Sequence, residues 1–165
     1  MQSTSLVTGA NGHLGNNLVR VLVGKGERVI AGVRNPAHAD ALRKLGSEVA
    51  RVDLLDKASL LDAMRGVDVL YQVGAVFKHW AKDPERDIYH ANLAGTRHAL
   101  EAAAEAGVER VVYVSSLAAL DHTRMPITET GWNANRSNVY YRSKTDSEWW
   151  PRASSLRRSR QHRRS

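Results

Sequence analysis

The stretch Thr8-Gly9-Ala10-Asn11-Gly12-His13-Leu14-Gly15 decides the expected fold of this 165-residue chain. It follows an apolar run at residues 6–7 and opens a segment whose apolar residues recur at helical spacing. At such a junction the first glycine permits a sharp turn, the second lets a pyrophosphate approach the main chain, and the third lets the helix pack on the strand. The free N–H groups at the positive end of the helix then face the phosphates. The sequence thus predicts a dinucleotide site at Gly9, Asn11, Gly12, His13, Leu14 and Gly15.

The rest of residues 1–116 alternates between short β-branched runs and longer segments at helical spacing. The β-branched runs lie at residues 29–31, 49–52, 67–70 and 111–114, and the helical segments at residues 39–45, 60–64 and 87–106. This alternation indicates βαβ units, which join parallel strands through right-handed crossovers. We therefore expect an α/β domain over residues 1–150, with a doubly wound parallel sheet (Rossmann) in strand order 3-2-1-4-5. In that order the fifth strand is an uncovered edge.

The composition excludes several classes of protein. The chain has no cysteine, which rules out a disulfide framework and a thiol nucleophile. No apolar run approaches the roughly 18 residues of a membrane span, and the start does not resemble a secretory signal, so we expect a cytoplasmic protein without a membrane partner. The seven histidines show no paired ligand spacing, so no metal site is expected.

The net charge of +7 is concentrated in the last fifteen residues. Residues 151–165 hold six arginines and no acid, whereas residues 1–150 carry 18 basic and 17 acidic side chains. The terminal segment has too few apolar residues to fold, so it is predicted to be a disordered Arg/Ser-rich tail. An arm that binds nucleic acid and an accidental terminus, such as translation in a shifted frame, are both consistent with it. The nearly neutral body favours the second interpretation.

Arg34 guides the choice of cofactor. It ends the second predicted strand, nineteen residues after Gly15, where an NAD site would have an acid that accepts from the ribose 2′-hydroxyl. A guanidinium instead suits a 2′-phosphate, which favours NADP over NAD, although a solvated surface arginine is the alternative. Asp53 follows the third strand and would accept from the adenine amino group or cap a turn. The other predicted contacts of the cofactor are Leu54, Val73, Gly74 and Ala75.

Three further residues are predicted to take part in the reaction. Tyr140 and Lys144 are four residues apart and share a face if they lie on a helix. A nearby ammonium makes a tyrosine phenol a stronger acid, and the lysine can also hold the nicotinamide ribose. Ser116 closes the fifth strand at the carboxyl edge of the sheet, where ligands of such folds bind. A hydroxyl and a phenol that converge on one oxygen suit carbonyl–alcohol interconversion, whereas an incidental surface pair is the alternative.

The order of these motifs resembles that of the extended short-chain dehydrogenase/reductases. The matching stretches are residues 8–15, the strand end at Asp53, Asn92-Leu93-Ala94-Gly95-Thr96, Val114-Ser115-Ser116 and Tyr140-Tyr141-Arg142-Ser143-Lys144. The resemblance covers residues 3–148 and is greatest to the dihydroflavonol-reductase-like and NAD-dependent epimerase/dehydratase branch. It implies a catalytic group of Ser116, Tyr140 and Lys144, with Asn92 supporting the geometry of cofactor or substrate.

The chain also departs from that family's pattern. Family members continue into a carboxyl-terminal domain that shapes the substrate pocket, and we expect this substrate domain to be missing here. Pro151 is expected to stop the Tyr140 helix early, which disfavours the homodimer that this helix supports in the family. The favoured function is an NADP-dependent oxidoreductase that transfers hydride between NADP and a secondary alcohol or ketone of small size. A nucleotide-sugar epimerase or dehydratase with bound NAD, and a truncated, catalytically silent nucleotide-binding remnant, are the alternatives.

Overall fold

The computed structural model describes residues 3–78 and 80–148, so the predicted tail lies outside the described residues. Five strands form one sheet in the order β3-β2-β1-β4-β5, and all neighbouring strands are parallel. This confirms the predicted doubly wound topology. The strands are β1 (Thr4–Thr8), β2 (Arg28–Val33), β3 (Glu48–Arg51), β4 (Val69–Gln72) and β5 (Arg110–Tyr113). The helices are α1 (His13–Gly24), α2 (Asp40–Lys44), α3 (Lys57–Ala63), α4 (Ala91–Glu105) and α5 (Val139–Ser147).

The described residues fall into two compact units. Unit 1 runs through Ala75 and adds His98–Val114, whereas unit 2 contains Val76–Arg97 and the chain from Ser115 onward. The whole sheet belongs to unit 1, and α5 belongs to unit 2. Helix α4 contributes its first residues to unit 2 and its remaining residues to unit 1.

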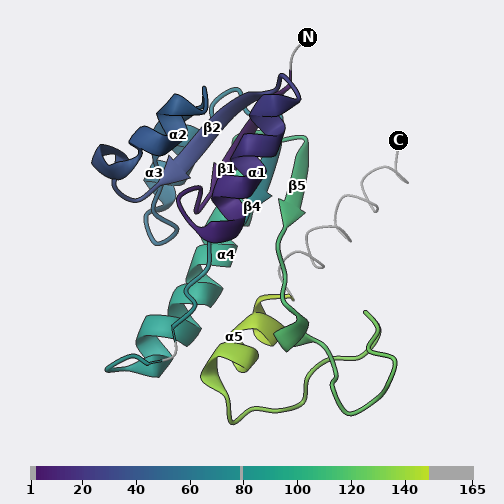
Figure 1. Ribbon diagram of the computed structural model, residues 1–165. Helices are drawn as coiled ribbons and strands as arrows, with labels where there is room; N and C mark the ends of the chain where they lie inside the picture. The colour runs from purple at the N-terminus through teal and green to yellow at the C-terminus, as the bar shows by residue number, and fades with distance from the viewer. Residues whose placement is uncertain (1–2, 79, 149–165) are drawn as a thin grey trace, which may run out of the picture. The chain divides into compact units, whose positions relative to one another are not determined.

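Unit 1 has three layers, with helices on both faces of the sheet (Figure 1). Neighbouring residues of β1 point to opposite faces, so Leu6 belongs to one core cluster and Val7 to the other. The Leu6 cluster is covered by α3 and by the alanines of α4, and the Val7 cluster is covered by α1 and α2. All five residues of β1 are buried, the apolar Leu6 and Val7 as well as the polar Thr4, Ser5 and Thr8, as expected for a strand covered on both faces.

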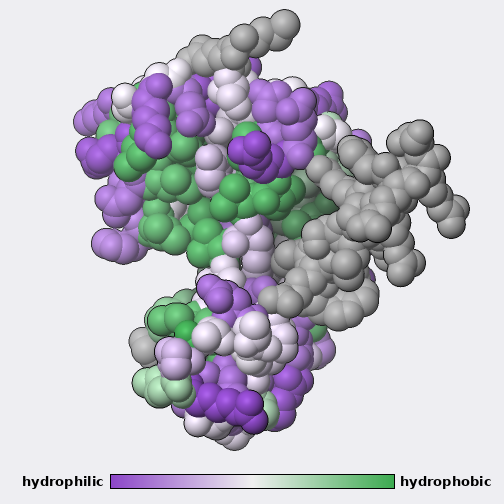
Figure 2. All heavy atoms as spheres, turned by 90° about the vertical axis from the view of Figure 1, so that its right-hand side faces the viewer, coloured by the Kyte–Doolittle hydropathy of each residue, from purple (hydrophilic) through white to green (hydrophobic). Residues whose placement is uncertain are grey.

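Strand β5 lies at one edge of this sheet, as the strand order predicts. In the described part of the chain its ladder partner is β4, with Val69 opposite Arg110 and Gln72 opposite Tyr113. Val112 is 39% exposed. Figure 2, which faces the side of the molecule on which Figure 1 shows β5, displays a band of hydrophobic residues across unit 1.

Unit 2 is built from short elements. The helix predicted over residues 87–106 begins with a π-helical segment, η2 (Glu85–His90), before it continues as α4. A short 3₁₀ helix, η3 (Leu117–Ala119), follows the sheet, and the isolated antiparallel bridge between Leu120 and Trp132 closes the loop after it. Helix α5 begins after Asn138, whose side chain caps it by accepting from the Tyr141 N–H at 3.0 Å.

Candidate functional site

The glycine-rich loop of unit 1 is shaped by contacts between main-chain atoms. Gly9 has a φ of +63°, and a Cβ there would lie 2.9 Å from the Cα of Gly74. A Cβ on Gly15 would lie 2.3 Å from the carbonyl oxygen of Gly9. These two positions therefore need glycine, the first for its backbone conformation and both for the close approach. The Gly12 N–H donates to Gly9 O at 2.9 Å and closes the turn.

The start of α1 meets the requirements of an anion site. Its N-cap is Gly12, which brings no capping side chain, and its first turn contains no acidic residue. Asn11, Gly12, His13 and Leu14 are all exposed. A Cβ on Gly12 would meet only Gly9 O, at 3.2 Å, so little of the protein packs against the start of the helix at this position. These residues fit the pyrophosphate of a dinucleotide, because a helix N-terminus with free donors favours negative charge.

A buried hydroxyl joins this loop to the end of β4. Thr8 Oγ1 accepts from the N–H groups of Val73 and Gly74, both at 3.0 Å, and donates to Gln72 Oε1 at 2.8 Å. Gln72 Nε2 in turn donates to the carbonyl of Gly74 at 2.9 Å. The hydroxyl thus fixes the segment that holds the predicted residues Val73, Gly74 and Ala75 beside the turn at Gly9. Sequence reasoning missed Thr8 and Gln72, although a polar residue in a buried strand is a signal that could have found them.

The residues predicted to contact the adenosine lie after the neighbouring strands. Arg34 is exposed after β2. Asp53 Oδ1 accepts from the Leu55 N–H at 3.0 Å, so its carboxylate caps a turn, which was one of its two interpretations. Asp56, not Asp53, caps α3. The Leu54 side chain lies so close to Gly74 that a Cβ there would be 3.1 Å from it. The structure thus brings Leu54, Gly74 and the turn at Gly9 together.

Lys144 is the most unusual titratable residue of unit 2. Its side chain is buried, with only 4% of the residue exposed. Burial lowers the pKa of this ammonium from its ordinary value of 10.5, and the Glu148 carboxylate opposes part of that shift. Tyr140 lies one turn earlier on the same face of α5 and packs edge-to-face against Phe77, with ring centroids 4.9 Å apart.

Ser116 and Asn92 occupy defined places in the same unit. Ser116 caps η3, where its Oγ accepts from the Ala118 N–H at 3.1 Å and keeps its own proton to donate. Asn92 is buried and binds both backbone groups of Val76, through Oδ1 at 2.7 Å and Nδ2 at 3.0 Å. Its second amide hydrogen goes to Ser143 Oγ, also at 3.0 Å. Both Nδ2 hydrogens are therefore used within the protein, so Asn92 acts here by holding α4, residue 76 and α5 together.

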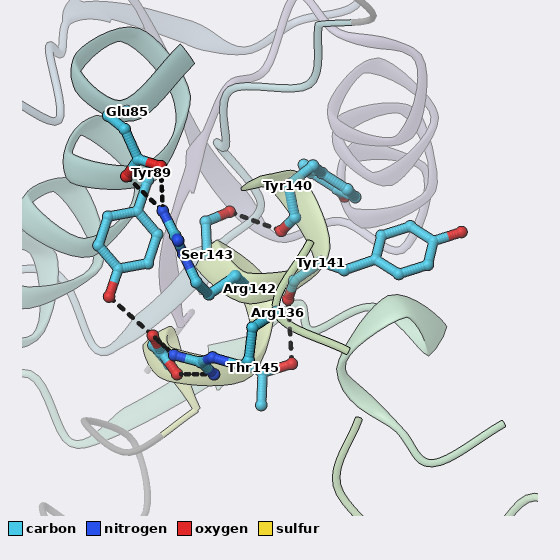
Figure 3. Close-up of polar contacts among 9 residues, drawn as sticks. Glu85, Tyr89, Arg136, Tyr140, Tyr141, Arg142, Ser143 and Thr145 are labelled. Carbon is cyan, nitrogen blue, oxygen red and sulfur yellow. Dashed lines mark hydrogen bonds and ion pairs between the residues drawn. The ribbon is translucent and has the colours of Figure 1, made fainter. Parts of the chain in front are cut away.

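Sequence reasoning also missed a group of charged and aromatic side chains on α5, on η2 and in the segment just before α5. Figure 3 shows Glu85, Tyr89, Arg136 and Arg142 meeting around this helix, on chain segments that are far apart in sequence. Tyr89 and its partner Asp146 are 57 residues apart. The sequence shows such residues only as ordinary surface charges, because nothing local links them.

Residues 3–78 and 80–148 contain neither a candidate metal site nor a candidate membrane span. No three histidine, aspartate or glutamate side chains gather there in a way that could hold a metal ion. No helix in the same residues has both the length and the apolar character to cross a bilayer.

Comparisons with known proteins agree with this geometry. A family model described as NAD(P)H-binding matches residues 9–157. The chain is 39% identical over 149 residues to sterol demethylase protein B of Methylococcus capsulatus, covering 88% of this chain and 45% of that protein. It is 41% identical over 120 residues to a putative dihydroflavonol 4-reductase of Synechocystis, covering 73% of this chain and 34% of that protein.

A solved structure shows the same fold with its cofactor. The crystal structure of Gre2 from Candida albicans in complex with NADPH superposes with a TM-score of 0.80 at 27% identity. The match covers 93% of this chain and 53% of that one. The chain therefore spans about half of that structure and less than half of the two curated relatives.

Proposed function

The chain belongs to the NAD(P)H-binding family, and on that premise we propose that it is the nucleotide-binding part of a reductase that interconverts a ketone and a secondary alcohol with NADP. The observation that carries the proposal is the uncapped, acid-free start of α1 behind a glycine turn. Several relatives bear the names of reductases, among them the putative dihydroflavonol 4-reductase. The alternative among enzymes, a nucleotide-sugar epimerase or dehydratase, uses the same cofactor and is distinguished by the experiments below.

Different residues of the chain would bind the cofactor and transfer the proton. The glycine turn and the N–H groups at the start of α1 bind the diphosphate, and the small residues 73–75 leave room for ribose and ring. The bound dinucleotide supplies or accepts the hydride. Tyr140 then exchanges a proton with the substrate oxygen, and the free proton of Ser116 Oγ hydrogen-bonds to that oxygen. The Lys144 ammonium stabilises negative charge that develops on the phenol, and it does so strongly because it is buried.

Arg34 gives the proposal its preference for NADP. It is exposed directly after β2, and a guanidinium there forms a charge-assisted pair with a 2′-phosphate but only a weaker hydrogen bond with a 2′-hydroxyl. We expect Arg34→Ala to weaken NADPH binding by about tenfold, the equivalent of one charge-assisted hydrogen bond, and to leave NADH affinity nearly unchanged. Fluorescence titration of the 165-residue chain with both nucleotides measures this. Equal loss for NADPH and NADH would remove the argument for a phosphate contact.

Turnover is tested with NADPH and a panel of small ketones. The proposal expects oxidation of NADPH that falls at least 10²-fold in Tyr140→Phe while NADPH binding persists. Phe77→Leu, which keeps an apolar side chain beside residue 140, is the matched control and should retain most of the rate. If the chain binds NADPH but reduces no ketone, the proposed reductase activity is wrong and only nucleotide binding is supported. Purification with tightly bound NAD would favour the epimerase alternative.

A further inference from the structure

Helix α5 lacks the buried apolar face by which most helices pack onto the rest of a protein. Its buried residues are Ser143, Lys144 and Ser147, and none of them is apolar. The helix has only nine residues, fewer than the about 12–15 that an isolated helix needs even for marginal stability. Apart from the packing of Tyr140 against Phe77, polar contacts therefore set much of its position, and the two residues that bear the proposed chemistry, Tyr140 and Lys144, depend on those contacts.

The contacts of Arg142 and Asp146 lie on the side of α5 opposite Tyr140 and Lys144, in addition to the hydrogen bond between Asn92 and Ser143. Arg142 and Asp146 are four residues apart and share a face, offset by half a turn from the face of Tyr140. Figure 3 shows the Arg142 and Tyr140 side chains leaving the helix on different sides. The face of the helix with Arg142 and Asp146 thus contacts the rest of unit 2, and the opposite face carries the Tyr140 phenol.

Asp146 is the centre of this arrangement. Its Oδ2 accepts from the Tyr89 hydroxyl at 2.7 Å, and Arg136 donates to both carboxylate oxygens, at 2.8 and 2.7 Å. The Asp146 side chain is 24% exposed, so this bidentate pair is partly screened from water. The Arg136 guanidinium holds the pKa of Asp146 below its ordinary value, whereas the hydrogen bond to that carboxylate raises the pKa of Tyr89.

Arg142 ties the same helix to η2 a second time. It pairs with both carboxylate oxygens of Glu85, and its guanidinium carbon lies 4.4 Å from the centroid of the Tyr89 ring. Tyr89 thus meets α5 twice, with its ring under Arg142 and its hydroxyl on Asp146. A connected network of this kind holds geometry better than isolated surface pairs do.

We propose that the five residues Glu85, Tyr89, Arg136, Arg142 and Asp146 form a clamp that sets the rotation of α5 and so positions Tyr140 and Lys144. This inference rests on the proposed function for the role of those two residues, but the clamp itself is a property of unit 2. The π-helical form of η2 agrees with it, because π-helical turns are frequent at functional sites. The clamp residues are positioning residues and touch neither cofactor nor substrate.

Two conservative variants test the clamp. Tyr89→Phe keeps the ring under Arg142 and removes only the hydroxyl, and Asp146→Asn keeps the shape and removes the charge. Both should lower kcat by about 10- to 100-fold, the loss that misplacing a reacting group produces. NADPH affinity should stay within about twofold, because the phosphate loop belongs to unit 1. The double variant should lose less than the product of the two single losses, since both variants alter the hydrogen bond between Tyr89 and Asp146.

An NMR titration of the Lys144 amine provides a readout that does not depend on turnover. If the clamp holds α5 in register, loosening it admits water to Lys144, and the pKa of this amine moves back toward 10.5 in both variants. Asp62→Asn, which breaks an exposed ion pair with Arg65 in unit 1, is the matched control and should change neither kcat nor the titration. Arg136→Met, on a half-exposed side chain, serves as a milder variant if the others fail to fold.

The outcomes separate this inference from the proposed function. Unchanged Lys144 titration and a kcat within twofold of Asp62→Asn, in folded Tyr89→Phe and Asp146→Asn, would overturn the clamp. If the unmodified chain turns over no ketone but its Lys144 titration still shifts in both variants, the proposed function fails and the clamp stands.

Discussion

Replacing Gly15 by alanine tests whether the first helix packs on the first strand through bare main chain. A Cβ at this position would lie 2.3 Å from Gly9 O and 2.9 Å from Ala10 Cα, which are both backbone atoms. No side-chain rotation can relieve these contacts, so the loop itself must move. The same substitution therefore affects both the stability of the chain and the shape of the predicted phosphate site.

The size of the effect follows from two opposing contributions. Overpacking costs about 1–3 kcal/mol, and a clash with main chain belongs at the upper end of that range. The greater helix preference of alanine over glycine offsets about 1 kcal/mol of this cost. We expect Gly15→Ala to lower the free energy of unfolding by about 2 kcal/mol, which corresponds to a fall in Tm of about 4–8 °C for a chain of this size.

Gly24→Ala is the matched control on the same helix. A Cβ there would meet no atom within 4 Å, and Gly24 is the last residue of α1. The free energy of unfolding should rise by up to about 1 kcal/mol in that variant, so Gly24→Ala and Gly15→Ala should move Tm in opposite directions. Scanning calorimetry measures both. A Gly15→Ala variant whose Tm equals or exceeds that of the unmodified chain would refute the packing argument.

Three other substitutions test separate contacts. Thr8→Val leaves the Gly74 N–H and Gln72 Oε1 without their hydroxyl partner, whereas the Val73 N–H keeps its bond to Tyr71 O, and the variant should lower the free energy of unfolding by about 3 kcal/mol in denaturant titration. Asn92→Ala frees both backbone groups of Val76 in a buried setting, so a loss of about 2 kcal/mol or more is expected by the same assay, and a neutral effect would contradict the bonding described. Lys144→Met removes a buried amine whose pKa is lowered in the folded state, so the unfolded chain binds more protons between that pKa and 10.5. The free energy of unfolding of the unmodified chain should therefore rise with pH across that window, and the rise should be absent from the methionine variant.

The sheet was predictable because its pattern is local. The glycine stretch, the β-branched runs and the connecting helical segments each lie within a few residues, and handedness then limits the order of the strands. The strand limits differ slightly from the expected ones. The fourth strand occupies Val69–Gln72 instead of residues 67–70, and the Val67 N–H bonds back to Met64 O in the turn after α3 instead of to a neighbouring strand.

The site was only partly predictable, for reasons of sequence distance. The glycines and the Tyr140–Lys144 spacing could be read directly, but the hydroxyl of Thr8 meets Gly74 across 66 residues. The π-helical form of η2 could not be predicted from the hydrophobic pattern, because Ile88 is the one buried residue of this segment. Likewise, the contacts of Asp146 come from residues 10 and 57 positions away, which no local pattern encodes.

The Gly12→Val variant tests nucleotide binding most directly. The backbone at Gly12 is extended, with φ −77° and ψ 169°, so valine fits the conformation while its methyl groups cover the exposed N–H groups of α1. Isothermal titration with NADPH should show at least about tenfold weaker binding, a loss of about 1.4 kcal/mol, in a chain that keeps its helix content by circular dichroism. Undiminished NADPH affinity in the folded variant would contradict a diphosphate site at this turn.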